Sequence, residues 1–115
     1  MRYLLTICND ESAMLALSPD EDAAMLAQYG EFAEEMTRRG VLREGLRLRP
    51  TSDATLVRVR DGAVLTTDGP FAETKEQIGG IFLVECADLD EAIEIAGKIP
   101  HALYGSVEVR PIWEM

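Results

Sequence analysis

The sequence lacks the elements on which several classes of protein depend. It has one histidine, His101, so a metal site with several histidine ligands cannot form. It has no Gly-rich phosphate loop, no CxxC pair and no nucleophile-elbow motif. No segment approaches the roughly 18 to 20 apolar residues that are needed to cross a bilayer. We therefore expect no metal, no cofactor and no association with a membrane.

Positive charge is also scarce. The 11 basic residues stand against 21 acidic ones, and the net charge of −10 argues against nucleic acid as a partner, since such binding neutralises phosphates. Seven basic residues nevertheless fall in one central stretch: Arg38, Arg39, Arg43, Arg47, Arg49, Arg58 and Arg60. These arginines either hold a small anion or balance the acidic helices of the chain itself.

An export signal is missing as well. The first residues, MRYLLTICNDES, contain one arginine and a short apolar run and then become acidic, which is unlike a signal peptide. We therefore expect a cytoplasmic protein with reduced cysteines. Its 115 residues, 47% of them hydrophobic, are typical of one globular domain.

The clearest local signal is a helix start at Ser18-Pro19-Asp20-Glu21. Ser18 is a candidate N-cap, Pro19 suits the first helical position, and Glu21 completes a capping box. The apolar stripe that follows has helical spacing: Met25, Tyr29, Phe32 and Met36. Gly40 ends the helix.

The remaining pattern predicts strands and a second helix. Residues 10–17 suggest a loop with a short helical turn, and residues 54–70 a β-hairpin that turns at Asp61-Gly62. Asp88 and Glu91 cap a second helix, for which we predict a buried stripe of Leu89, Ala92, Ile93 and Ala96. Strands are expected at 3–8, 41–50, 79–87 and 104–114.

Without the inserted hairpin, these elements follow the order β-α-β-β-α-β. This order predicts a ferredoxin-like α+β fold, with both helices on one face of the sheet. The other face then needs a cover, and we expect a homodimer that packs sheet to sheet. Cys8 and Cys86 end antiparallel strands in this arrangement, so we expect no disulfide between them.

Four segments together resemble a known family. They are RYLL (2–5), SPDE (18–21), DGPFAETKEQIGG (68–80) and GSVEVRPI (105–112), and they resemble the YCII-related proteins, in the branch that contains the DGPF motif. The resemblance covers residues 1–115 as a single domain. It implies a dimeric α/β barrel. Some relatives are encoded beside sigma factors, which implies a regulatory setting and a possible sigma-factor partner.

The wider family includes members with a His-Asp pair proposed to be catalytic. Aligned on Gly40, the histidine position falls at Tyr29. Aligned on Pro100 and Gly105, the aspartate position falls at Ile99. Neither residue matches, so this pair is not carried over.

The segment that begins with Asp68 offers candidate site residues. Asp68 suits a tight turn with Gly69 and Pro70, but a turn does not explain the polar run that follows. Lys75 is a candidate for holding an anion, Glu73 or Glu76 for a base, and Phe71 for a ligand contact. The alternative is a structural loop that supports the hairpin.

The other candidates lie on predicted helices and strands. Tyr29 either donates a proton to a substrate or packs in the core, and His101 is interpreted as a loop residue. The strand faces that carry Arg47 and Arg58 either line an anion site or are solvated. Arg110 is a ligand-binding candidate, although we favour an ion pair with Glu108 inside the dimer.

Two functions from different classes follow. The first is an enzyme or binding protein for a small acidic metabolite, in a cleft between sheet and helices, with Tyr29, Asp68 and Glu73 as candidate catalytic residues. The second is a non-catalytic regulatory protein that contacts a sigma factor or another protein.

Overall fold

The computed structural model describes residues 1–71 and 74–114, which form an antiparallel sheet, a separate hairpin and three α-helices. The sheet contains β1 (Arg2–Asp10), β2 (Leu42–Arg47), β5 (Glu76–Glu85) and β6 (Ser106–Pro111) in the order β2-β5-β1-β6. The hairpin consists of β3 (Thr55–Arg60) and β4 (Ala63–Asp68). This mixed α+β architecture is compatible with the predicted ferredoxin-like fold.

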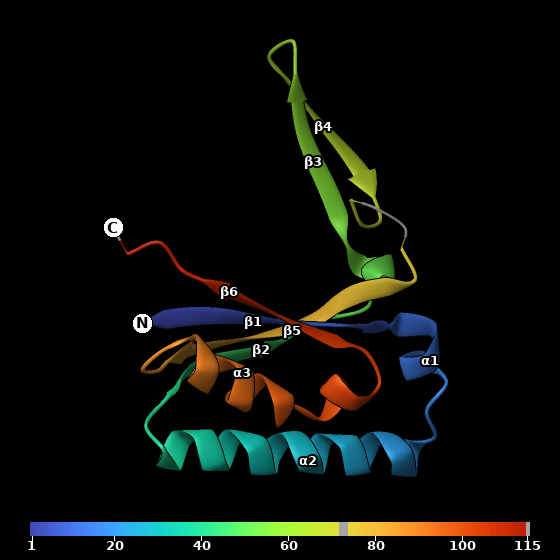
Figure 1. The fold of residues 1–115 in the computed structure, drawn as a ribbon. Coiled ribbons are helices and arrows are strands. Elements are labelled where there is room, and N and C mark those ends of the chain that lie inside the picture. The colour runs from blue at the N-terminus through green and yellow to red at the C-terminus, as the bar shows by residue number, and fades with distance from the viewer. Residues whose placement is uncertain (72–73, 115) are drawn as a thin grey trace.

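The helices lie together on one side of the sheet, and the hairpin rises from the other (Figure 1). They are α1 (Glu11–Leu15), α2 (Pro19–Arg38) and α3 (Leu89–Gly97), with short 3₁₀ turns η1 (Thr51–Asp53) and η2 (Pro100–Leu103). Among the described residues, no helix is both long and apolar enough to span a membrane.

The capping box of α2 forms as predicted. The Ser18 hydroxyl accepts a hydrogen bond from the Glu21 backbone N–H at 3.1 Å, and the Glu21 carboxylate accepts one from the Ser18 N–H at 2.9 Å. The bond from the Ser18 backbone N–H lowers the pKa of the Glu21 carboxyl group, because it favours the charged form. At the other end Gly40 takes a positive φ of 73°, a conformation that favours glycine.

The stripe predicted for the second helix is only partly right. Ala92 and Ala96 are buried, but Leu89 and Ile93 are 49% and 53% exposed, and the fully buried isoleucine is Ile95. The exposed pair Leu89 and Ile93 is as apolar as the buried Ile95, so helical periodicity alone could not identify the buried face. Ile99, which is 1% exposed, continues the stripe that packs against the sheet.

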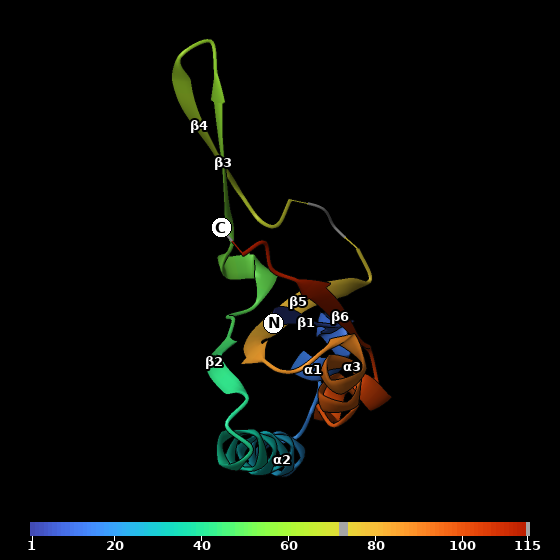
Figure 2. The same ribbon diagram turned by 60° about the vertical axis from the view of Figure 1, so that its left-hand side comes forward.

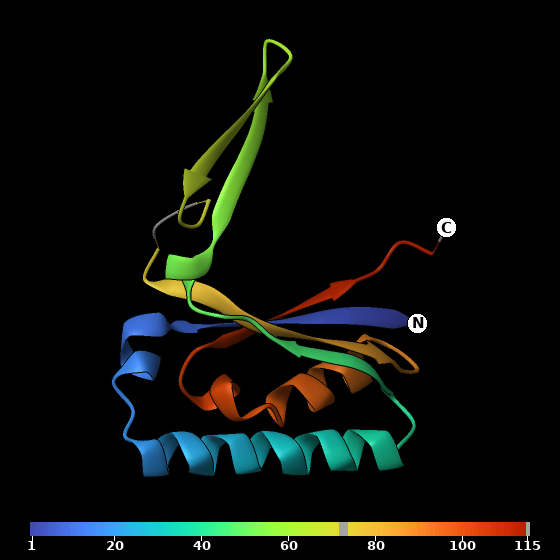
Figure 3. The same ribbon diagram turned by 180° about the vertical axis from the view of Figure 1, so that it is seen from behind.

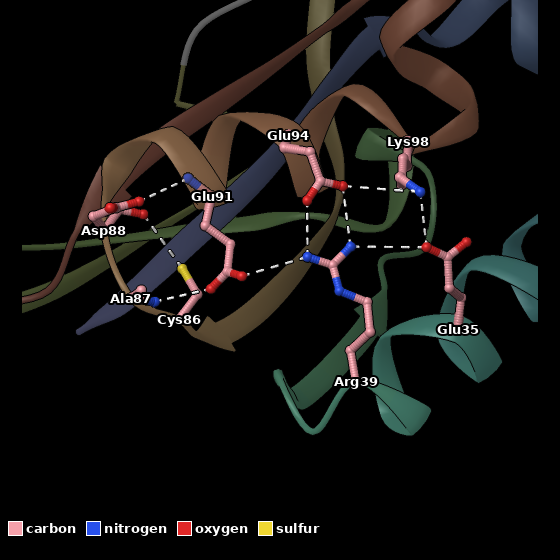
Figure 4. A network of polar contacts seen from close by, with 8 residues as sticks. All are labelled: Glu35, Arg39, Cys86, Ala87, Asp88, Glu91, Glu94 and Lys98. Atoms are coloured by element: carbon pink, nitrogen blue, oxygen red, sulfur yellow. Dashed lines mark hydrogen bonds and ion pairs between the residues drawn. The ribbon is translucent and has the colours of Figure 1, made fainter.

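A network of ion pairs joins the C-terminal end of α2 to α3 (Figure 4). The Arg39 guanidinium makes two hydrogen bonds to Glu94, at 2.8 and 3.0 Å, and lies 3.5 Å from Glu91. Lys98 donates to Glu35 at 2.8 Å. Single surface pairs add little stability, but a shared network fixes the relative position of the two helices.

The hairpin turns at Asp61 and Gly62, which both have positive φ as a tight hairpin turn requires. It stands away from the sheet (Figure 3). The radius of gyration is therefore 16.1 Å, compared with about 13 Å for a compact domain of this length.

Strand β5 begins at Glu76, three residues before the expected start at 79. Glu76 and Gln77 pair with Asp10 and Asn9 of β1, because β1 also extends further than predicted. Two residues of the polar run are thus part of the sheet. Both cysteines are unpaired thiols, as expected.

Core packing on α3 gives the first prediction. Ile95→Ala should lower the free energy of unfolding by about 2 to 5 kcal/mol, since it leaves a cavity under the helix. Ile93→Ala is the matched control two residues away, with an expected loss below about 0.5 kcal/mol because Ile93 is exposed. Denaturant unfolding measures both, and equal losses would contradict the observed orientation of α3.

Candidate functional site

A cleft of about 490 Å³ lies between the N-terminal half of α2, the short helix α1 and the β2 edge of the sheet. Figure 2 looks nearly along α2 and shows β2 at the outer edge of the sheet. Most of the cleft wall is apolar and includes Met14, Met25, Leu26, Leu46, Leu48 and Phe82. A cavity of this size can accommodate a small organic molecule.

A glycine lies on each wall of the cleft, and the two have different roles: Gly45 makes room for the Phe82 ring, and Gly30 leaves the space beside α2 open. On the helix, Phe32 and Met36 fill the space beneath the C-terminal half of α2, whereas Gly30 lines the cleft. On the sheet, Gly45 pairs with Phe82, and a Cβ at Gly45 would lie 2.7 Å from the Phe82 ring. A Cβ at Gly30 would meet nothing within 4 Å, so it would point into open space.

The cleft contains a direct contact between Tyr29 of α2 and His101 of η2. The Tyr29 hydroxyl is hydrogen-bonded to His101 Nδ1, and the two ring centroids are 5.3 Å apart. His101 Nε2 lies 3.1 Å from the Met14 sulfur. A thioether only accepts hydrogen bonds, so Nε2 carries the proton, and Nδ1 accepts the hydroxyl proton of Tyr29.

Burial keeps both members of this pair neutral. It raises the pKa of Tyr29 to about 12, against smaller lowering effects of a backbone hydrogen bond with His101 and of the Arg47 charge. It also lowers the pKa of His101, and the positive charge of Arg47 acts in the same direction. At neutral pH the pair therefore consists of a phenol that donates to an uncharged imidazole.

Charged side chains line the mouth of the cleft. Arg49 is held by Asp53 at 2.8 Å, and the Glu11 carboxylate accepts two hydrogen bonds from Thr51, at 2.6 and 2.5 Å. Arg47 has a looser ion pair, because its guanidinium nitrogen lies 3.7 Å from the Asp22 carboxylate. Arg47 is thus the mouth residue that can turn to a ligand at least cost.

The structure separates the other candidate residues from Tyr29. Lys75 lines a second hollow with Pro70 and Thr74, which adjoins the cleft at Glu11 and Gln77. Asp68 is exposed at the end of β4, and Phe71 is 81% exposed. Glu73 lies outside the described residues.

The structure also separates the candidate anion-binding arginines into two groups. Arg47 and Arg49 line the cleft, whereas Arg58 and Arg60 lie on the hairpin, because β3 belongs to a separate sheet. Arg110 is ion-paired with Glu108 at 2.8 Å on β6. The pairing itself was predicted, and its position inside a dimer stays a prediction.

His101 was wrongly interpreted as an ordinary loop residue. It is only 7% exposed and belongs to the 3₁₀ turn η2. The sequence held one signal for this contact. In the family resemblance, the aspartate that accompanies the histidine position at Tyr29 falls at Ile99, two residues before His101. Ile99 itself is buried in the core, so the nearby histidine supplies the polar contact.

The fold and cleft define a mixed α+β domain with a polar pair in an apolar cavity. A family model for the YCII-related domain matches residues 1–115, so the chain belongs to the YCII-related family. An uncharacterized protein of Rhizobium meliloti (strain 1021) is 40% identical to it over 114 residues, which cover 97% of this chain and 92% of that protein. Membership of the DGPF branch stays a prediction.

The lowered pKa of His101 predicts a pH-dependent stability. As pH falls below about 6.5, the unfolded chain binds a proton before the folded chain does, so the free energy of unfolding decreases. Above that pH the full stability is present. His101 is the single histidine, so the loss between about pH 6.5 and 5.5 belongs to it.

His101→Gln should flatten this pH dependence. Denaturant unfolding at several pH values between about 7.5 and 5.5 checks it, above the pH at which carboxylates such as Glu94, whose pKa is lowered in the folded state, begin to be protonated in the unfolded chain. Equal slopes in the two proteins would contradict a buried, neutral His101.

Proposed function

We propose that the cleft binds a small organic acid with an apolar body. The observation that carries this proposal is the hydrogen-bonded Tyr29–His101 pair, placed in a cavity whose walls are otherwise largely apolar. Ligand sites typically combine apolar walls with a few polar groups that fix the orientation of the ligand. In this proposal, Tyr29 and His101 supply those groups.

Arg47 supplies the contact for the carboxylate of the ligand. Its pair with Asp22 is long and solvent-exposed, with exposed fractions of 69% and 43% for the two side chains. Such a pair contributes little stability, so a ligand carboxylate that forms a bidentate bond with the guanidinium can replace it. The apolar part of the ligand then lies against Met25, Leu26 and Phe82.

The proposed site coincides with one position of the His-Asp pair that the resemblance implies for other members, although neither residue of that pair is present here. In the resemblance described above, the histidine of some family members falls at the position of Tyr29, and the proposed site is built around that position. Here the histidine comes from the other side of the cleft, at His101, so the pair differs from that of those relatives in both residues.

We also propose that the protein is a homodimer. The sheet face opposite the helices carries three partly exposed apolar side chains, Leu4, Ile81 and Leu83. The hairpin adds three valines on one of its faces, Val57, Val59 and Val64, which are 58% to 68% exposed. A two-stranded hairpin is marginal alone in water, which favours a partner.

The length of the hairpin is also compatible with the proposed dimer. Each hairpin strand of six residues is about 20 Å long, whereas packed sheets lie about 10 Å apart. The hairpin is therefore long enough to lie beside the sheet of a second copy. The sigma-factor partner and the cytoplasmic location stay predictions from the sequence.

Ligand binding can be tested by filling the cleft. Gly30→Leu places a side chain in the cleft and should abolish binding of small arylalkyl carboxylates such as 3-phenylpropionate and phenylpyruvate. For the unchanged protein, ligand at roughly 100 times its dissociation constant should stabilise the fold by about 2.7 kcal/mol, which a thermal-shift assay detects.

The matched control is Gly97→Leu, since Gly97 is also an uncrowded helical glycine but lies outside the cleft. It should leave binding unchanged. Arg47→Met should weaken carboxylate binding about tenfold, in line with the loss of a charge-assisted hydrogen bond. Binding that survives Gly30→Leu would contradict the proposed site.

The dimer gives a separate prediction. Light scattering should give twice the chain mass of 12.7 kDa. Val64→Asp should shift the protein to monomer, because it places a charge on the proposed contact face of the hairpin. Leu103→Asp is the control, since Leu103 is 83% exposed in the helix layer. A wild-type monomer would overturn the proposal.

A further inference from the structure

We infer that the Tyr29–His101 pair moves a proton on the bound ligand, so that the protein isomerises small carbonyl acids with an acidic C–H bond beside the carbonyl group. This inference rests on the proposed function, because it needs the ligand to bind in the same cleft. It adds an activity and a substrate class to the binding site.

The hydrogen-bond geometry supports a relay. Tyr29 donates its hydroxyl proton to His101 Nδ1, while its oxygen has two lone pairs, one for the backbone hydrogen bond with His101 and one that can accept another proton. Both residues line the cleft, so a ligand can approach the hydroxyl. The hydroxyl then stands between the base and the substrate, which is the position that a relay requires.

The step balances without an added reactant. The Tyr29 oxygen takes the proton of the substrate C–H bond while the hydroxyl proton of Tyr29 passes to His101 Nδ1. The C–H electron pair forms a new C=C bond, and the π electrons of the carbonyl move onto its oxygen, giving an enolate and an imidazolium. In the return step His101 gives a proton back to Tyr29, and Tyr29 protonates a different substrate atom. The net change is an isomerisation.

The resting protonation states match this direction of transfer. Burial lowers the pKa of His101, so its Nδ1 is unprotonated at neutral pH and can act as a base. Tyr29, with a pKa of about 12, keeps its proton and serves as the relay. When His101 becomes an imidazolium, its Nε2–H keeps the same neighbour, the Met14 sulfur, so no group has to move.

Arg47 completes the arrangement. Its positive charge lowers the pKa of both Tyr29 and His101, which means that its field reaches the pair. The same field stabilises negative charge on an enolate that forms beside Tyr29. A carboxylate held at Arg47 also orients the neighbouring carbonyl and C–H bond toward the hydroxyl.

The test is hydrogen–deuterium exchange at C3 of two 2-oxo acids, phenylpyruvate and 4-methyl-2-oxopentanoate. Proton NMR in D₂O follows the loss of the C3 signal, with the buffer rate subtracted. We expect exchange catalysed by the unchanged protein and a decrease of about 100-fold or more in Tyr29→Phe and in His101→Gln. Both variants should still bind the two probes, because Arg47 and the apolar wall remain, but with an affinity reduced by up to about tenfold through the loss of one polar contact, by calorimetry.

The outcomes separate this inference from the proposed function. If the probes bind without exchange, or Tyr29→Phe exchanges as fast as the unchanged protein, the inference is wrong and the binding site remains. If neither probe binds, the proposed ligand class is wrong and the inference falls with it. Tyr29→Phe keeps the aromatic ring that packs near Phe82, so it tests the relay even if His101→Gln fails to fold.

Discussion

The uneven packing of α2 is the constraint on which the rest of the structure depends. Its C-terminal half is fixed to the sheet by Phe32 and Met36, and to α3 by the ion pairs of Arg39. Its N-terminal half borders the cleft, whose sheet wall includes Gly45 and Phe82. A single straight helix therefore covers a filled core at one end and a cleft at the other.

This packing also explains why the polar pair lies where it does. Tyr29 stands at the boundary between the two halves, so its ring packs near Phe82 of the core and the residue also lines the cleft. A buried phenol needs a hydrogen-bond partner, and η2 brings His101 to that point. The proposed chemistry thus arises where the core ends, with Arg47 at the mouth.

Local signals in the sequence predicted most of the fold. The capping box at Ser18, the turn at Asp61-Gly62 and the strand order all depend on neighbouring residues or on simple connectivity. The site was harder to predict, because Tyr29 and His101 are 72 positions apart and only packing brings them together. The buried stripe of α3 also depended on packing, since Ile93 and Ile95 are equally apolar.

The central claim is that ligands bind beside Tyr29 and His101, and NMR chemical-shift mapping with phenylpyruvate tests it most directly. The account predicts that the largest shifts fall on the backbone amides of Tyr29, Gly30, Gly45 and His101. Shifts centred on Gly69, Thr74 and Lys75 would contradict it, because they would place the ligand in the second hollow, beside the DGPF segment.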